Sequence, residues 1–465
     1  MNIAHPMQRE VSGHDDADGR IQRRAKMANA NRWHYVLLAF LVTTFGLGNV
    51  RDSALCNAES CSTFFSGMGA VEMAIEYLAS GVTTYDLPFK MHPVSALDLH
   101  SLTRPILAAR YGAAHVTMEC DILQLFDLPM WSEEWGWELK LQVLLGAPMR
   151  DTYVSPSGET WSIPTADCDC SGSPCRDFSP NNAYRRDGRD GVNNSAFLAW
   201  CAWHIRRGTK ILFHENVQQF DMLWAVGILS LYFSCVVLFI SPEDILFDST
   251  ARSRMLICAA RRGVTKFRVD VNDAYEKMKD YFRATPLANQ CITVGDIFQA
   301  DAAEIQTEEY EQCMMRKVCP RPAGGDLQYS LHETLQKYIR NYNFMFWSMF
   351  GILPHICPWL VFNLQDNPHG RLTWSAHSKK LPSLRRDSRY IWSSFHLRWA
   401  TFLERLSAFG FPTYQESAEA ARVPLYSPAI RDVPAQLMLG DSTVVGSVGA
   451  AMGLALSCIE ILDCE

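Results

Sequence analysis

The sequence predicts an α/β fold built on a mainly parallel sheet, and the order of its apolar segments carries this prediction. Between Ser62 and Gly263, short apolar runs typical of buried strands alternate with stretches of helical periodicity. The run "STFFSG" precedes the helical pattern "VEMAIEYLA", and "KILFHENV" precedes "FDMLWAVGILSLYF". Strands and helices that alternate in this way pack as a parallel sheet with helices on both faces.

The composition is that of a large globular chain with reduced cysteines. The 465 residues are 48% apolar, which is enough to bury a large core, and the net charge of −7 creates no global attraction to nucleic acid. Fifteen scattered cysteines, an odd number, favour a reducing compartment over a disulfide framework. Cys168, Cys170 and Cys175 lack a second group at ligand spacing, so we expect no metal.

The first 61 residues are expected to be a polar tail followed by an apolar segment of uncertain role. Residues 1–31 lack periodic apolar positions and contain the run "HDDADGR", which is typical of disorder. Residues 33–50 are apolar and follow several cations, as a targeting or anchoring segment would, although a helix packed in the core is the alternative. A membrane-spanning role is not favoured, because the apolar stretches are short.

The rest of the chain divides into three parts. Residues 62–263 carry the alternating strand and helix pattern, and residues 264–396 are less regular. Residues 397–465 return to helical periodicity in "FLERLSAFGF" and "VGAAMGLALSCIEIL". We therefore expect a smaller unit at residues 264–396.

A glycine turn between a predicted strand and a predicted helix is the first candidate site. Gly67 and Gly69 would let the backbone approach a ligand and expose helix amides to it, although a plain tight turn is the alternative. Asp86 ends the next strand-like run, "VTTYD", where a carboxylate can accept both hydroxyls of a ribose. Asp121, after "HVTMEC", is placed to hold an adenine amino group, or is a solvated loop residue.

Two further groups of charged residues flank predicted buried strands. Glu215 and Asn216 end the strand "ILFHEN", at the sheet edge where parallel α/β folds hold their sites; a helix cap is the alternative. Arg252 and Arg254 alternate before the strand "MLICAA", so both are expected to point to one face and to bind an anion or a polarised carbonyl oxygen. An exposed sheet edge is the alternative for the arginines.

These blocks together resemble the cytosine-C5 DNA methyltransferases, whose motifs occur in the same order. "FFSGMG" looks like the cofactor loop of that family, "GSPCRDFS" like its Pro-Cys catalytic loop, "ENV" like its Glu-Asn-Val motif and "TARSR" like its Gln-x-Arg-x-Arg motif. "RWATFLERLSAFGFP" is similar to its Arg-x-Leu-Thr-x-x-Glu…Gly-Phe-Pro block, and "GDSTVVGSVGAAM" to its closing Gly-Asn-Ser motif. The six matches extend from about Thr63 to Leu456.

The resemblance implies a Rossmann-like S-adenosylmethionine-dependent methyltransferase fold with an inserted smaller target-recognition region. Residues 62–263 and 397–465 would form the catalytic core, and residues 264–396 would be the recognition region. The implied activity is transfer of a methyl group from S-adenosylmethionine to C5 of a flipped-out cytosine in DNA. An RNA substrate is an alternative. The implied location is the nucleus or another DNA-containing compartment.

The resemblance also implies the roles of individual residues. Cys175, which follows Pro174, would add to C6 of the base, and Glu215 would hold the Watson–Crick edge next to Asn216. Arg254, with Arg252, would act at O2 or orient the loop. The cofactor side would comprise Phe65, Ser66, Gly67, Met68, Gly69, Asp86, Asp121, Ile122, Gly440 and Ser442.

The sequence departs from the family pattern at several positions. Thr250 replaces the usual Gln, Asp441 the usual Asn, and Arg176 the Gln that usually follows the cysteine. Asp167 and Asp169 lie in a strand that is normally apolar, and an unpaired buried aspartate is costly. A catalytically degenerate nucleic-acid-binding homologue is therefore the alternative to an active enzyme.

Overall fold

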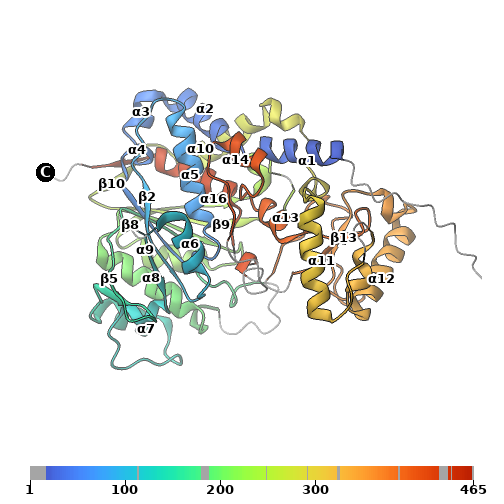
Figure 1. Ribbon diagram of the computed structural model, residues 1–465. Coiled ribbons are helices and arrows are strands. Elements are labelled where there is room, and N and C mark those ends of the chain that lie inside the picture. The colour runs from blue at the N-terminus through green and yellow to red at the C-terminus, as the bar shows by residue number, and fades with distance from the viewer. Residues whose placement is uncertain are drawn as a thin grey trace, which may run out of the picture.

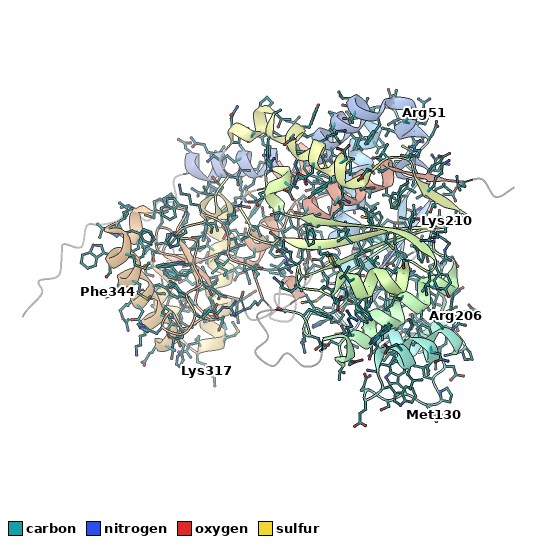
Figure 2. The ribbon with its side chains drawn as sticks, turned by 180° about the vertical axis from the view of Figure 1, so that it is seen from behind. Arg51, Met130, Arg206, Lys210, Lys317 and Phe344 are labelled. Atoms are coloured by element: carbon teal, nitrogen blue, oxygen red, sulfur yellow. The ribbon has the colours of Figure 1, made fainter. Side chains whose placement is uncertain are left out.

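The computed structural model describes residues 17–112, 115–179, 188–247, 249–290, 292–321, 325–385, 388–428, 438–440 and 442–462. These residues form a larger unit around a sheet and a smaller unit beside it, at the right of Figure 1. Figure 2 shows both units from behind, with Phe344 at the outer end of the smaller one and Met130 and Arg206 on the larger one.

A seven-stranded sheet in the described part of the chain organises the larger unit. The strand order is β3-β2-β1-β6-β7-β9-β8. Neighbours from β3 to β7 run parallel, whereas β9 is antiparallel to both β7 and β8. The predicted α/β class with a mainly parallel sheet is confirmed. The strands are β1 (Ser60–Phe64), β2 (His92–Asp98), β3 (Val116–Glu119), β6 (Cys168–Ser171), β7 (Ile211–Asn216), β8 (Phe233–Ile240) and β9 (Arg254–Arg261).

Helices cover both faces of this sheet, because its central strands are apolar on both sides. Along β7, Ile211 and Phe213 belong to one core cluster and Leu212 to the other. The first cluster includes residues of α2 (Trp33–Phe45), α5 (Ala70–Thr83), α6 (Thr103–Tyr111), α10 (Val271–Arg283) and α16 (Val445–Ser457). The second includes residues of α7 (Trp137–Gly146), α8 (Asn194–Arg207) and α9 (Met222–Leu229).

Residues 1–31 were expected to be a disordered tail, and this expectation is wrong for residues 17–31, the part of the tail that the structure describes. Residues Ala17–Ala30 form helix α1, which packs against α14 (Gln415–Ala421). Arg23 Nε donates to the carbonyl oxygen of Phe298 at 2.6 Å, Arg24 pairs with Glu416 at 3.2 Å, and Lys26 pairs with Asp296 at 3.1 Å. The cations before the apolar segment therefore dock α1 on the fold. Residues 1–16 lie outside the described part.

The apolar segment after α1 is a core helix. Trp33 of α2 is 1% exposed and stacks on Tyr77 with ring centroids 5.6 Å apart. It lies against α16, where a Cβ added to Gly449 would come within 2.5 Å of Trp33 Cη2. No helix in the described part of the chain is long and apolar enough to cross a membrane. Of the two interpretations of residues 33–50, the structure supports packing in the core.

Replacing Trp33 with Ala is expected to lower the free energy of unfolding by about 3–5 kcal/mol, because it leaves a cavity between α2, α5 and α16. Denaturant titration followed by circular dichroism measures the change. The control is Ile21→Ala on α1, where the side chain is 61% exposed and the effect should be small. Equal, small effects of the two substitutions would mean that α2 does not contribute to the core.

The smaller unit was expected to comprise residues 264–396, but it begins later in the chain than residue 264. Strand β10 (Thr265–Phe267) pairs with β14 (Ile459–Ile461), and α10 buries Tyr275, Met278 and Phe282 in the larger core. A separate core begins at Leu327 and ends at Trp399. It is formed around α12 (Glu333–Phe350) and the strands β11 (Val361–Asn363), β12 (Ile391–Ser393) and β13 (Arg398–Trp399), and α11 (Ala302–Arg316) packs on it through Ile305.

The remaining elements are short. They are α3 (Leu47–Arg51), α4 (Ala54–Asn57), α13 (Phe402–Ser407), β4 (Thr152–Val154), β5 (Thr160–Ser162) and the 3-10 turns η2 (Ile122–Leu125), η3 (Gly188–Asp190), η4 (Pro242–Ile245), η5 (Pro286–Asn289), η6 (Val294–Ile297), η7 (Leu327–Ser330) and η8 (Pro354–Ile356).

Candidate active site

The carboxyl ends of the parallel strands bring most of the predicted site residues to one edge of the sheet. The glycine turn follows β1, Asp121 follows β3, the Pro-Cys loop follows β6, and Glu215 and Asn216 end β7. Parallel strands end at the same edge, so segments far apart in the sequence become neighbours there. This edge is the candidate active site.

The turn after β1 is shaped for close approach of a ligand. Phe65, Gly67 and Gly69 have φ angles of 63°, 54° and 80°, and α5 begins directly after Gly69. The amide of Gly67 donates to Asp98 Oδ2 at 2.8 Å, and Tyr426 Oη donates to the carbonyl oxygen of Met68 at 2.6 Å. The loop is thus held from both sides, with the amides of the first turn of α5 next to it.

A buried carboxyl group that no sequence motif predicted lies beneath this loop. Glu72 is fully buried on α5, and its Oε1 accepts a 2.5 Å hydrogen bond from Thr63 Oγ1. The Thr63 hydroxyl also lies 2.7 Å from the Ser66 hydroxyl of the loop. Burial raises the pKa of Glu72 to about 7, which favours the neutral acid below the loop. In the sequence, Glu72 is marked only by its place in the first turn of a helix whose other residues on that face are apolar.

The structure contradicts the placement of Asp86 at the cofactor side. The run "VTTYD" continues and ends α5, because Val82 is buried by helical packing, and no strand forms there. Asp86 is exposed in the turn before β2, at the opposite edge of the sheet. A helix of 14 residues separates it from Gly69 by roughly 21 Å.

Asp98 occupies the position that Asp86 was expected to fill. It ends β2, and its carboxylate accepts hydrogen bonds from the amides of Gly67 and His100, both at 2.8 Å. The segment "HPVSALD" shows the apolar run of a strand followed by an acid, which is the signal that could have identified it.

Asp121 and Ile122 lie where the sequence placed them, after β3. The Asp121 side chain is exposed and accepts a hydrogen bond from the amide of Leu123 at 3.0 Å, capping η2. Ile122 is 1% exposed and belongs to the second core cluster. An exposed carboxylate beside a fixed apolar residue suits recognition of a flat polar ring.

The carboxyl-terminal segment closes on the glycine loop. A Cβ added to Gly67 would lie 3.6 Å from Ser442 Oγ, so the two residues are neighbours. Arg252 Nη2 donates to the carbonyl oxygen of Gly440 at 3.1 Å. Asp441 lies outside the described residues.

The Pro-Cys loop is held by the neighbouring strand β7. The hydroxyl of Ser173 lies 2.9 Å from His214 Nε2, and Asn216 Nδ2 donates to the Ser173 carbonyl oxygen at 3.1 Å. Burial lowers the pKa of His214 to about 3, so this contact joins two neutral groups. After Pro174, Cys175 is half-buried, and its carbonyl oxygen accepts from the amides of Phe178 and Ser179 at 3.1 and 2.9 Å.

Glu215 and Arg254 form an ion pair beside this loop. Arg254 Nε lies 2.7 Å from Glu215 Oε1, and each side chain is about 15% exposed. A Cβ added to Gly172 would lie 2.9 Å from Glu215 Oε2, so the glycine lets the carboxylate approach the loop. The carboxylate, the guanidinium and the Cys175 loop therefore meet.

Arg252 and Arg254 contact different groups, contrary to the expectation that both arginines point to one face. Strand β9 begins only at Arg254, so strand alternation does not extend back to Arg252. Arg252 Nη1 donates to the carbonyl oxygen of Leu384 at 3.2 Å, and its guanidinium lies 5.1 Å from the centre of the Phe409 ring. Arg252 thus ties the segments that contain Leu384 and Gly440 to the larger unit.

The aspartates that suggested a degenerate enzyme are fully paired. Asp169 is completely buried and accepts hydrogen bonds from Ser62 Oγ, Ser171 Oγ and Trp200 Nε1 at 2.7, 2.5 and 2.8 Å. Its Oδ2 also lies 3.3 Å from His204 Nε2. Asp167 accepts from the amide of Glu59 and from Lys210 Nζ, both at 2.9 Å. The concern about an unpaired buried charge is therefore unfounded.

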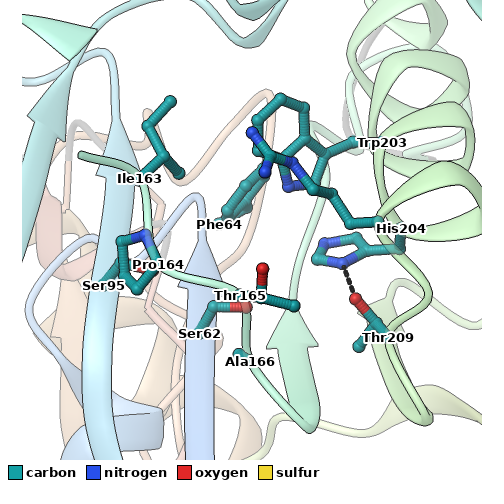
Figure 3. A pocket seen from close by; sticks show the side chains of 11 residues that line it. Ser62, Phe64, Ser95, Ile163, Pro164, Thr165, Ala166, Trp203, His204 and Thr209 are labelled. Atoms are coloured by element: carbon teal, nitrogen blue, oxygen red, sulfur yellow. Dashed lines mark hydrogen bonds between the residues drawn. The ribbon is translucent and has the colours of Figure 1, made fainter. Parts of the chain in front are cut away.

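Figure 3 shows the residues around His204. Trp203 and His204 project from α8 toward Ser62 and Phe64 of β1, and a small pocket lies between them and residues 163–166. His204 Nδ1 lies 2.9 Å from Thr209 Oγ1, so both ring nitrogens have polar neighbours. Neither here nor elsewhere among the described residues do three His, Cys, Asp or Glu side chains form a group that suits a metal ion.

Comparison with known proteins gives similarity at the level of the fold. No protein-family model matches the sequence, and no curated protein matches it. Similar solved structures include methyltransferase EhMeth of Entamoeba histolytica, the Dnmt2 methyltransferase of S. pombe and a putative DNA modification methyltransferase encoded within a prophage of E. coli. Their sequence identities are 10%, 15% and 11%, and their TM-scores are 0.45, 0.41 and 0.45. The similarity covers 86%, 85% and 86% of this chain and 98%, 98% and 97% of theirs.

Proposed function

We propose that this chain is an S-adenosylmethionine-dependent DNA (cytosine-5)-methyltransferase that uses Cys175 as its nucleophile. The observation that carries the proposal is the meeting of the Cys175 loop with the Glu215–Arg254 pair, at the sheet edge that also holds the glycine turn. A thiol, a carboxyl group and a guanidinium at one place are the groups that activation of a cytosine ring needs.

The chemistry assigned to these residues begins with a nucleophilic addition. The Cys175 thiolate forms a bond to C6 of the base, and the electron pair of the C5–C6 double bond makes C5 nucleophilic. Glu215 takes up a proton when the base enters, donates it to N3 as negative charge develops there, and takes it back when Cys175 leaves; Arg254 stabilises the charge on the ring. When C5 takes the methyl group, the bond between that group and the sulfonium sulfur breaks and a neutral thioether is left. A base from solvent then removes the C5 proton, and Cys175 leaves as a thiolate when the double bond re-forms.

The cofactor side fits S-adenosylmethionine, which supplies an electrophilic methyl group when it is bound. Gly67 and Gly69 have positive φ angles, which glycine adopts without strain and which shape the turn, and the Asp98 carboxylate lies next to Gly67 to accept ribose hydroxyls. Asp121 and Ile122 suit an adenine ring, and Ser442 closes the loop. The loops around the site also contain Phe65, Ser66 and Met68 in the glycine turn, Pro174 in the Pro-Cys loop and Gly440 in the closing segment.

The target base must leave the duplex to reach Cys175, because C6 is shielded in stacked DNA. We assign contacts with the DNA around that base to the smaller unit, as a target-recognition region. A DNA substrate would place the protein in the nucleus or in another compartment that contains DNA.

Incubation of the purified chain with labelled S-adenosylmethionine and matched DNA and RNA, followed by nucleoside analysis, tests the proposal. Methyl transfer to RNA alone would identify RNA as the substrate. Methyl transfer to neither nucleic acid would support a catalytically degenerate homologue.

A matched pair of substitutions tests the cofactor side. Asp98→Asn is expected to raise the dissociation constant for S-adenosylmethionine by roughly tenfold to a hundredfold, since hydrogen bonds to a charged acceptor contribute about 1.5–3 kcal/mol. Asp86→Asn should leave the constant unchanged, because Asp86 lies at the opposite edge of the sheet. Isothermal titration calorimetry measures both. A loss of affinity confined to Asp86→Asn would reverse the assignment.

A further inference from the structure

The end of strand β7 contacts the Pro-Cys loop with side chains from both of its faces. Successive side chains of a strand point to opposite faces, so Glu215 points to one side of the sheet and its neighbours His214 and Asn216 point to the other. Glu215 approaches the loop at Gly172. His214 and Asn216 both contact Ser173. The chemistry assigned to the site uses Glu215 but gives His214 no role.

The hydrogen bonds around Ser173 have a defined direction. Asn216 Oδ1 accepts from the amide of Val217 at 2.9 Å, which leaves Asn216 Nδ2 as the donor to Ser173. Nδ2 lies 3.1 Å from the carbonyl oxygen of Ser173 and 3.3 Å from its hydroxyl. Because the hydroxyl accepts from Asn216, its own proton is free for His214 Nε2, which lies 2.9 Å away. Both polar groups of Ser173 are therefore held by β7.

His214 is itself fixed by aromatic packing. The fully buried imidazole lies with its centre 4.7, 5.1 and 5.2 Å from the ring centres of Phe197, Trp200 and Phe220. In the neutral ring, an accepting Nε2 leaves the proton on Nδ1, which has no hydrogen-bond partner among the described residues. Burying an imidazole costs free energy that one hydrogen bond offsets only in part, and a phenylalanine would fill the same space without this cost. The contact with Ser173 is thus the one use of the polarity of His214 that the described residues show.

We propose that His214 is a positioning residue for the nucleophile Cys175, which it holds through the hydroxyl of Ser173. The inference rests on the proposed function, because it assigns His214 to the site of that reaction. Pro174 restricts the backbone between Ser173 and Cys175, so fixing the one limits where the other can lie. His214 and Glu215 are adjacent on one strand, so the loop and the acid are held by the same rigid element. A displacement of about 1 Å between reacting groups can lower a rate by roughly a hundredfold.

Two substitutions remove the contact from either side. His214→Phe keeps an aromatic ring in the buried space, and Ser173→Ala leaves the carbonyl oxygen to Asn216. Each is expected to lower kcat by roughly tenfold to a hundredfold and to change KM for DNA by less than about twofold, because neither side chain is assigned to substrate binding. The double variant should be no slower than the slower single variant, since both changes remove one contact. His214→Gln, whose amide oxygen can accept from Ser173, should restore kcat to within about fivefold of the native value.

Hydrogen exchange of the free chain measures the hold on the loop independently of activity. Amides of residues 172–179 should exchange at least about fivefold faster in His214→Phe and Ser173→Ala, whereas amides of β7 and α8 should be unchanged. The matched control is His115→Phe, which removes another buried imidazole, with Nδ1 3.0 Å from Thr117 Oγ1. His115 lies just before β3, at the opposite edge of the sheet, so this variant should keep native kcat and native loop exchange.

The two measurements separate the possible outcomes. Native loop exchange in both variants would overturn the proposal, and so would native kcat in both. Faster exchange that spreads over β7 and α8 would also overturn it, because His214 would then only stabilise the core. A native chain that transfers no methyl group would remove the proposed function, and the exchange of residues 172–179 would still decide whether His214 holds the loop.

Discussion

Replacing Cys175 with Ser should abolish methyl transfer and leave cofactor binding intact. The serine hydroxyl has nearly the same size but is a far weaker nucleophile, so the expected loss in kcat is roughly 10⁴–10⁶-fold, as for other nucleophiles removed from an active site. Transfer of label to DNA measures the loss. The rise in melting temperature caused by S-adenosylmethionine should persist, because Cys175 is not part of the cofactor side.

The matched control is Cys319→Ser, which changes an exposed thiol outside the candidate site and should have no effect. DNA that contains 5-fluorocytosine is a second probe, because the fluorine cannot leave C5 as a proton does. We expect a complex with the native chain that survives denaturation and no such complex with Cys175→Ser. Full activity of Cys175→Ser would remove the proposed mechanism.

Replacing Glu215 with Gln is expected to lower kcat by roughly 10²–10⁴-fold with a smaller change in KM, the range typical for loss of a group that handles a proton in the transition state. The amide keeps the size of the side chain but cannot hold and release the proton at N3. Single-turnover measurements at saturating cofactor and DNA isolate this step.

A second carboxylate in an ion pair provides the control. Glu460 pairs with Lys266 at 3.1 Å where β14 meets β10, away from the candidate site, and Glu460→Gln should keep full activity. If Glu215→Gln and Glu460→Gln behave alike, Glu215 has no role in catalysis.

The parts of the fold that depend on local sequence could be predicted from it. The strand, glycine turn and helix around Gly67, and the Glu215–Asn216 strand end, follow from apolar runs and turn residues that lie next to one another in the chain. The same dependence on local sequence explains the wrong placement of Asp86. Val82 and its β-branched neighbours resemble a strand, and only packing in the core makes this stretch the end of α5.

Contacts between distant segments explain the other errors. Asp169 looks costly in the sequence because its partners Ser62 and Trp200 lie 107 and 31 residues away. The polar helix α1 has no apolar periodicity to reveal it, and Arg23 and Lys26 dock it on residues about 270 positions later. No local pattern carries such information, so these features become visible only when the chain is folded.

The packing of α2 against α16 has a consequence for biosynthesis. Trp33 leaves the ribosome long before Gly449, the residue against which it packs, and at 5–20 residues per second the interval is about 20–80 s. During this time the apolar side of α2 has no partner from α16, and the glycine turn lacks its neighbour Ser442. A nascent chain therefore exposes the apolar side of α2 during this time, and its glycine turn gains Ser442 as a neighbour only when translation reaches the closing segment.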